Sequence, residues 1–269
     1  MEALMKSLLL LIEGDDELRP VVKELQATPV PGAQNPFEGT LSNKTRIIAV
    51  TTGVGPEQAY RVTADAIRQF NPDYVLSAGT CGALVQGLEV SDWVVTGDVR
   101  AIGQAHQQWS TFETLRANDE TAAPRLGQAL KQTPRWHQGR LVTVADEPIH
   151  CAMAKAEIAT LHDAIAVDME SYGIARAAVE NGLPWVVARV VVDTPALPLP
   201  DLGAMNVHTG RPPLSGIAKY VLMNPFAGPQ RLHGLWSLVQ TYAFHLVRIL
   251  PEFTDGSRVS VPREECQLV

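Results

Sequence analysis

The sequence of 269 residues contains few cysteines and no dense cluster of basic side chains. Its three cysteines, Cys81, Cys151 and Cys266, form an odd set without CxxC spacing, which argues against a disulfide framework or a zinc site. The net charge is −7, and phosphate neutralisation would need clustered Lys and Arg, so a nucleic-acid surface is not expected. Free thiols in a reducing cytoplasm and small-molecule partners are the expectation.

Long hydrophobic runs and internal repeats are also absent from the sequence. No stretch approaches the roughly 20 uncharged apolar residues that a membrane span needs. The first apolar run, Leu8–Ile12, is too short for a signal sequence and is followed at once by acidic residues. It predicts a first strand, in a soluble cytoplasmic protein without a membrane span.

Short apolar runs alternate with amphipathic segments along the chain, a pattern typical of strands joined by crossover helices. Such a chain is long enough for one large domain or two small ones. The predicted strands are Leu8–Ile12, Ile47–Thr51, Tyr74–Ala78, Trp93–Thr96, Leu141–Val144, Ile165–Asp168 and Trp185–Val191.

The segments between the strands predict helices and two long loops. Helical spacing, with Pro at a tolerated first position, predicts a helix over 56–70, and another helix is expected to start near Glu170. Residues 102–120 show no clean period and predict a long loop, as does the Pro-rich segment 194–214. An apolar stripe from Leu235 to Ile249 predicts a C-terminal helix, with a loosely held tail from about residue 252.

Two glycine-containing stretches follow predicted strands. In "TTGVGPEQA" (51–59), backbone amides near a helix start would suit an anion, although a plain turn is an equal alternative. In "SAGTCGAL" (77–84), Gly79 permits close approach of the backbone and Thr80 supplies a hydroxyl, although a structural turn explains the pattern as well.

Three further stretches carry acidic residues at strand ends. Asp168-Met169-Glu170 ends one strand, where either acid could instead cap the next helix. Arg189 lies in an apolar strand and needs an acidic partner, and Asp193 ends that strand, where it could be turn chemistry. Glu17 lies in "IEGDDELRPVV" (12–22), where acids could simply favour a helix start.

Taken in this order, the five stretches resemble the nucleoside phosphorylase and nucleosidase family, and in particular the methylthioadenosine/S-adenosylhomocysteine nucleosidases. The resemblance spans most of residues 8–195, and the VDME stretch is its most specific part. It implies an α/β fold: a single domain over 1–269 with three α/β/α layers, a twisted mixed central sheet flanked by helices, and 194–250 as a C-terminal loop and helical extension. It also implies a homodimer that cleaves the N-glycosidic bond of a purine nucleoside, with no cofactor and no metal.

The resemblance implies a role for each matched residue. Glu170 would grip the ribose hydroxyls with Met169 packed beside the sugar, and Asp193 would hydrogen-bond purine N7. Glu17 would position and deprotonate the attacking water, with Arg189 nearby to hold acidic side chains in place.

Other matched positions would complete the site. Thr80, beside Gly79, matches the small hydroxyl residue near the nucleophile, and backbone groups around Ile149 in "VADEPIHCAMAKAEI" would read the adenine edge. Two departures place the ordinary methylthioadenosine substrate in doubt. Val192 precedes Asp193 where the family usually has Ser, and Glu147-Pro148 replaces small and aromatic residues in the base segment.

The choice between water and phosphate depends on which anion-binding groups are present. Ser77 stands where the bacterial phosphorylases of this family have an arginine, which favours hydrolysis, although Arg19 and Arg46 could still reach an anion. Phosphorolysis is the alternative, and a nucleoside-binding protein without catalysis is a second one.

The C-terminal part, from "LPLPDLGAMNVHTGRPPL" through the stripe-bearing helix, resembles the hopanoid-associated phosphorylase/nucleosidase branch. That resemblance implies adenine removal from an adenosylated triterpenoid, a lipid-linked nucleoside. The alternative is that the apolar stripe is core or subunit interface.

Overall fold

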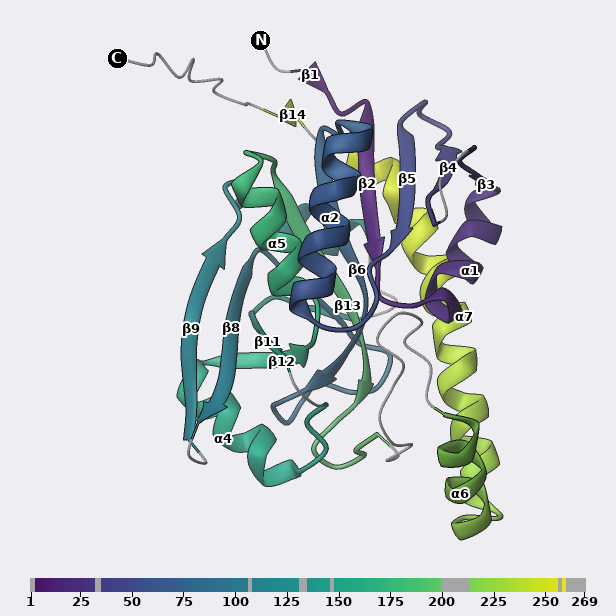
Figure 1. Ribbon diagram of the computed structural model, residues 1–269, viewed down its shortest axis with the longest axis vertical. Coiled ribbons are helices and arrows are strands. Elements are labelled where there is room, and N and C mark those ends of the chain that lie inside the picture. The colour runs from purple at the N-terminus through teal and green to yellow at the C-terminus, as the bar shows by residue number, and fades with distance from the viewer. Residues whose placement is uncertain are drawn as a thin grey trace.

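The computed structural model describes residues 3–31, 35–105, 108–130, 135–145, 148–199, 213–255 and 258–259 (Figure 1). Its strands are β1 (Ala3–Leu4), β2 (Ser7–Ile12), β3 (Thr28–Pro29), β4 (Phe37–Thr40), β5 (Arg46–Thr51), β6 (Tyr74–Ala83), β7 (Trp93–Thr96), β8 (Asp98–Ala105), β9 (Gln108–Arg116), β10 (Trp136–His137), β11 (Arg140–Val144), β12 (Ala164–Asp168), β13 (Trp185–Asp193) and β14 (Arg258–Val259). Its helices are α1 (Asp15–Leu25), α2 (Pro56–Phe70), α3 (Ala122–Ala129), α4 (Ala152–His162), α5 (Ser171–Glu180), α6 (Leu214–Met223) and α7 (Ala227–Asp255).

One twisted, mixed sheet contains all described strands except the small β1–β14 pair. Along its main path the order is β3-β4-β5-β2-β6-β12-β11-β8-β9, and β13 joins β6 to β7. Strands β5, β2, β6 and β13 are parallel neighbours, so their carboxyl ends meet at one edge. Strand β12 pairs antiparallel with the last residues of the long β6, which brings the end of β12 to the same region. Ligands of α/β sheets usually bind at such an edge.

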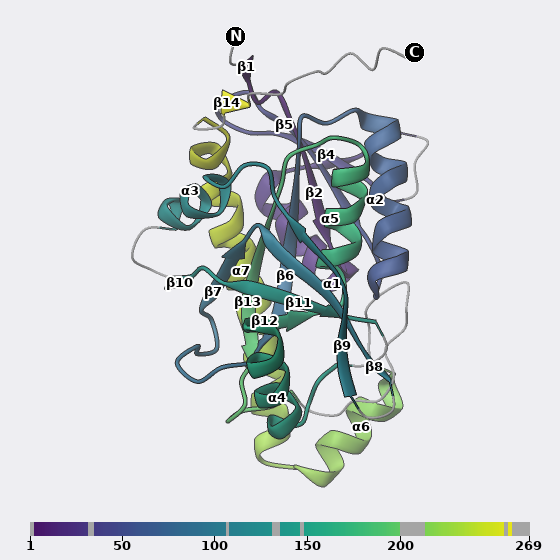
Figure 2. The same cartoon turned by 90° about the vertical axis from the view of Figure 1, so that its left-hand side faces the viewer.

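Helices cover both faces of the sheet, which confirms the predicted α/β architecture (Figures 1 and 2). In β2, Leu8, Leu10 and Ile12 face the core shared with α1, α3 and α7, while Leu9 and Leu11 face the core shared with α2 and α5. Alternate residues of a strand point to opposite faces, so a strand covered on both sides is apolar throughout. This explains the uninterrupted run of four leucines.

Helices α2 and α5 lie side by side on one face of the sheet (Figure 2). Their approach is close because Gly173 has no side chain: a Cβ there would lie 1.9 Å from the backbone oxygen of Pro56. Helix α2 begins at Pro56 as predicted, and α5 begins at Ser171 with Glu170 as its N-cap residue. The packing of these helices therefore holds the start of each one near the carboxyl ends of the strands.

All seven predicted strands are present, but the predicted loop over 102–120 is wrong. Residues 98–105 and 108–116 form the antiparallel pair β8–β9 instead. Strand β9 lies at the edge of the sheet, and its described residues from Ser110 to Glu113 are exposed. An edge strand open to solvent lacks the alternation of buried and exposed positions on which a sequence prediction depends.

The C-terminal helix is longer than the sequence indicated. Within the predicted stripe, Tyr242, Leu246 and Ile249 are buried in the core, which supports the core alternative for that half. The loosely held tail from about residue 252 is wrong up to the end of α7, because Phe253 is fully buried. Residues 194–199 carry no helix or strand, as predicted, while 200–212 lie outside the described residues.

The low number of cysteines and the lack of long apolar runs led to two predictions, one about thiols and one about membrane spans. Cys81 is a buried free thiol and Cys151 an exposed one, as predicted, while Cys266 lies outside the described residues. Among the helices that the structure describes, none combines the length and apolar character needed to cross a bilayer.

Candidate active site

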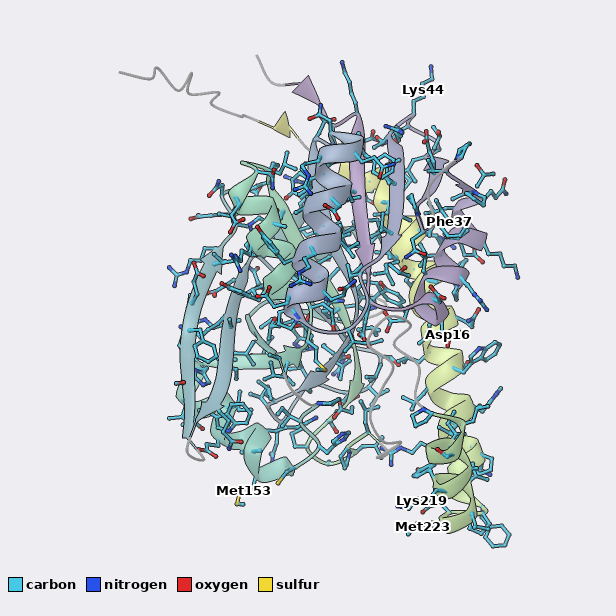
Figure 3. All side chains as sticks on the ribbon, in the orientation of Figure 1. Asp16, Phe37, Lys44, Met153, Lys219 and Met223 are labelled. Carbon is cyan, nitrogen blue, oxygen red and sulfur yellow. The ribbon has the colours of Figure 1, made fainter. Side chains whose placement is uncertain are left out.

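A cavity of about 320 Å³ lies at the carboxyl ends of β2, β6, β12 and β13. Its lining includes six of the eight residues that the sequence singled out: Glu17, Thr80, Ile149, Met169, Glu170 and Asp193. The other two, Gly79 and Arg189, are not among the lining residues. Asp16, which also lines the cavity, is labelled in Figure 3 at the start of α1, beside α7.

Arg189 is fully buried behind the cavity in the middle of β13. Its Nε donates to Asp168 Oδ2 at 2.9 Å, and its Nη2 donates to Ser171 Oγ at 2.9 Å and to Ser77 Oγ at 3.0 Å. Register pairs Arg189 with Gly79 on β6, where a Cβ would lie 2.3 Å from Nη1 of the guanidinium. Gly79 is therefore needed to make room for the arginine, which positions other groups without lining the cavity.

The carboxylates around Arg189 keep it charged. Burial lowers its pKa, but the nearby Asp168, Glu170 and Glu17 outweigh burial and raise the pKa overall. Asp168 also accepts hydrogen bonds from the Thr143 hydroxyl at 2.7 Å and from its helix neighbour's backbone, Ser171 N, at 3.2 Å. Asp168 thus serves chiefly as the partner of Arg189 and as an acceptor for the first backbone N–H of α5, which is the structural role that the sequence left open for it.

Glu170 is buried at the cavity wall, between β12 and α5. Its Oε1 accepts a hydrogen bond of 2.9 Å from the backbone N of Gly55, whose φ of 92° lies in a region that favours glycine. The glycine turn expected to present amides to an anion thus presents this amide to a side chain of the protein. Burial raises the pKa of Glu170 well above its ordinary value, and the charge of Glu13 raises it further.

Glu13 is a cavity residue that the sequence interpretation missed. It directly follows β2, is half-buried, and makes a side-chain hydrogen bond with Glu170. Two carboxyl groups can form such a bond only when one of them carries a proton. Burial, followed by repulsion from Glu17, raises the pKa of Glu13 to about 8. The position of Glu13 directly after the first strand was the available signal in the sequence, but the acidic residues that follow it, including Glu17, offer equal candidates.

Glu17 lies in the first turn of α1 and is also half-buried at the cavity. The Thr80 hydroxyl donates to its carboxylate, while its Oε2 is buried without a hydrogen-bond partner among the described groups. Burial raises the pKa of Glu17, and the positive charge of Arg189 opposes the increase. Glu17 and Thr80 therefore lie in contact, as the resemblance implied, and Oε2 of Glu17 has no hydrogen-bond partner among the described groups.

Asp193 ends β13 and is bound by Lys155 of α4, in an ion pair that is buried on both sides. A Cβ at the neighbouring Gly82 would lie 2.6 Å from Asp193 Oδ1 and 3.2 Å from Lys155 Nζ, so the pair also depends on a glycine. Burial raises the pKa of Asp193, and the ammonium group of Lys155 counteracts this. The signal for Lys155 was a lone lysine in the apolar stretch "CAMAKAEIA".

Apolar side chains form the rest of the cavity wall. Ile149 and Met169 contribute from the body of the protein, and Leu235 and Val239 contribute from α7. Pro148 also lines the cavity, whereas Glu147 lies outside the described residues.

The cavity is strongly acidic. Its described lining contains six carboxylate residues and no Lys or Arg: Glu13, Asp16, Glu17, Asp168, Glu170 and Asp193. Neither Arg19 nor Arg46, the two residues expected to reach an anion, lines this cavity. Arg46 begins β5, at the opposite end of the strand from the cavity, and pairs with Glu38 at 2.8 Å, while Arg19 borders a different groove. Ser77, which stands where related phosphorylases have an arginine, accepts a hydrogen bond from Arg189.

Metal ligation finds no support within the part of the chain that the structure describes. There, no group of three or more His, Cys, Asp or Glu residues is arranged to hold a metal ion.

Comparisons with known proteins agree with this architecture. The chain is 31% identical to the 5'-methylthioadenosine/S-adenosylhomocysteine nucleosidase of Actinobacillus succinogenes over 58% of this chain and 71% of the relative, and 29% identical to that of an Exiguobacterium species over 59% and 71%. Two solved structures share the fold. One is the Helicobacter pylori enzyme of the same name with a bound immucillin (TM-score 0.68, 17% identity, 92% and 99% of the two chains), and the other is a futalosine hydrolase mutant from that organism (TM-score 0.67, 16%, 92% and 99%). Residues 9–207 match the phosphorylase superfamily, and the chain therefore belongs to that superfamily, as the sequence resemblance indicated.

Proposed function

We propose that the protein hydrolyses the N-glycosidic bond of a purine nucleoside, releasing adenine, with water as the nucleophile. The acidic lining of the cavity carries this proposal. Phosphate is an anion, and the described lining of the cavity contains no Lys or Arg to neutralise it, while any ionised carboxylate there would repel it. Water needs a group that accepts its proton, and the Glu17 carboxylate, which the Thr80 hydroxyl holds in place, supplies one.

The sugar would bind between β12 and the glycine turn. Breaking the C1′–N9 bond builds positive charge on the ribose, and nearby carboxyl groups stabilise such charge. Glu170 would bind the ribose hydroxyls, with its other side held by Gly55. Glu13 would add a second carboxyl group on this side, and the oxygens that the shared proton leaves free can accept hydrogen bonds from the ribose hydroxyls.

The attacking water would bind at Glu17. Its unpartnered Oε2 can accept a proton from water, and the Thr80 hydroxyl fixes the orientation of the carboxylate. Arg189 lies behind both groups and holds Glu17 in its electrostatic field without touching the substrate.

The leaving base would face the Asp193–Lys155 pair. Negative charge develops on the purine as the bond breaks, and a proton from Asp193 to N7 neutralises it. Lys155 then stabilises the carboxylate that remains. General acid catalysis of this kind contributes about 10²–10⁴-fold to the rate.

Two variants test the assignment directly. We expect Glu17→Ala and Asp193→Asn each to slow adenine release by about 10²–10⁴-fold, measured by chromatography of free base, while Glu24→Ala serves as the control. Glu24 is exposed on the same helix as Glu17 and outside the cavity. Wild-type protein that binds adenosine analogues and releases no base would instead establish the nucleoside-binding alternative.

For the 5′ substituent, we propose an apolar group of the adenosylated hopanoid kind. A groove of about 410 Å³ adjoins the cavity along α7 and shares Val192 and Leu235 with it. Its other lining includes Val90, Leu197 and Leu238, an apolar set suited to a hydrocarbon. Adenine release from adenosylhopane and from methylthioadenosine separates the candidates, and fast turnover of methylthioadenosine alone would remove the lipid substrate.

A further inference from the structure

The hairpin formed by α6 and the start of α7 leaves an unusual amount of apolar surface uncovered. Helix α6 buries none of its residues, although its sequence is LSGIAKYVLM. Leu222 is 82% exposed, and Phe226, in the turn to α7, is 88% exposed. Leu214, Met223 and Trp236 are likewise exposed. Several large apolar side chains exposed on one short hairpin indicate an interaction site.

The hairpin is nonetheless a defined structural unit. Gly228 N donates to Asn224 O at 2.8 Å, and the Asn224 side chain donates to Tyr220 O at 3.0 Å, which fixes the turn. Helix α6 packs mainly on α7. A ten-residue helix is marginal in water without tertiary packing, so its apolar side chains need a further partner.

The charge on this hairpin indicates what that partner is. Residues 214–236, which form the hairpin, contain no Asp or Glu, and their basic residues are Lys219 and Arg231, in a chain whose net charge is −7. Apolar side chains, a tryptophan and basic residues together, without acids, are typical of segments that lie in the interface of an anionic bilayer.

We propose that the α6–α7 hairpin docks the protein onto an anionic lipid bilayer, with Leu222, Met223 and Phe226 entering the boundary between headgroups and acyl chains. Figure 1 shows the hairpin at the end of the molecule opposite the β1–β14 pair, and Figure 3 labels Lys219 and Met223 there. A projecting end can enter a bilayer without a clash from the body of the protein. Trp236 is exposed on α7 about two and a half helical turns past Ala227, and a tryptophan suits the headgroup level.

The groove described above runs along the same helix. Arg231 and Leu235 line it, and α7 continues from the hairpin past the groove to the cavity. Docking would therefore place the apolar groove near the bilayer. The docking proposal itself does not depend on the substrate, because binding to vesicles is measured without any nucleoside.

Vesicle cosedimentation tests the proposal with the full chain. We expect the protein to pellet with vesicles of equal parts phosphatidylcholine and phosphatidylglycerol, more weakly with phosphatidylcholine alone, and less in high salt. Leu222→Ser/Phe226→Ser should abolish pelleting, and Lys219→Glu should weaken it about five-fold or more. The matched control is Phe112→Ser, which removes a 73% exposed aromatic side chain from β9 and should pellet like wild type.

Three outcomes would overturn the proposal. The first is no pelleting with anionic vesicles, and the second is equal pelleting of wild type and the Leu222→Ser/Phe226→Ser variant. The third is a wild-type dimer in sedimentation velocity that this variant converts to monomers without any binding to vesicles, which would assign the surface to a second copy of the chain. All altered side chains are exposed, so thermal unfolding should be unchanged and should separate loss of docking from loss of folding.

Discussion

The contact between the carboxyl groups of Glu13 and Glu170 makes their side of the cavity sensitive to pH. The pKa of Glu13 in the folded protein is raised to about 8, so folding favours the protonated carboxyl group. Such a group stabilises the fold at low pH, and this contribution is lost as pH rises from the ordinary glutamate pKa towards about 8. Above that value, two buried carboxylates repel each other.

Glu13→Gln should remove this pH dependence, because an amide makes the same contact without ionising. We expect the thermal stability of the variant relative to wild type to increase between about pH 5 and pH 8 and then level off. Thermal unfolding followed by circular dichroism across this range measures it, with Glu24→Gln as the exposed control. A constant difference across the range would show that Glu13 carries no shifted proton.

Lys155 should control the proton on Asp193. Its ammonium group lowers the pKa of Asp193 against the effect of burial, so Lys155→Met should let that pKa rise. The alkaline limb of the kcat/KM profile for adenine release should then move to higher pH, because Asp193 would keep its proton longer. Lys23→Met, on the exposed side of α1, should leave the profile in place. An unmoved alkaline limb in Lys155→Met, assayed below its unfolding temperature, would contradict the assignment.

At the scale of elements, the close packing of α2 and α5 holds the glycine turn against Glu170. Gly173→Ala would bring a methyl group within 1.9 Å of Pro56 O, so the helices must separate. We expect a loss of about 1–3 kcal/mol in the free energy of unfolding, measured in urea. Gly234→Ala is the matched control: its Cβ would meet nothing within 4 Å in α7, and it should be neutral or stabilising by roughly 0.5–1 kcal/mol. Equal effects of the two changes would refute the packing argument.

Elements with a strong local pattern could be predicted from the sequence, and those that depend on distant neighbours could not. Helix α2 has its proline start and regular apolar spacing, and its predicted bounds agree with the structure. Strand β9 lacks such a pattern, because among the described strands it pairs with β8 alone and its consecutive residues Ser110 to Glu113 are all exposed. The exposure of α6 was also beyond prediction, since its apolar sequence reads like that of a core helix.

The candidate site shows the same division. Glu17, Glu170 and Asp193 stand at strand ends in a recognisable order, and parallel strands bring such ends together. The pairings of Glu13 with Glu170 and of Lys155 with Asp193 join residues far apart in the chain, and no local pattern encodes them. Arg189 was singled out correctly as a buried charge needing an acid, but its place behind the cavity required the fold.

At the scale of the whole molecule, the acidic cavity supports the proposed use of water as nucleophile, and the α6–α7 hairpin extends the protein beyond that cavity. The predicted homodimer and the single domain over 1–269 remain predictions at this scale. Sedimentation velocity of the wild-type protein, which is part of the vesicle experiment, tests whether it is a dimer.

The central claim is hydrolysis without phosphate, and product analysis tests it most directly. Purified protein is incubated with methylthioadenosine and with adenosylhopane, with and without inorganic phosphate, and both products are identified by chromatography and mass spectrometry. The account predicts free adenine and a ribose with an unsubstituted C1 hydroxyl, at equal rates in both conditions. Adenine release that requires phosphate, with the 5′-substituted ribose 1-phosphate as the second product, would contradict it.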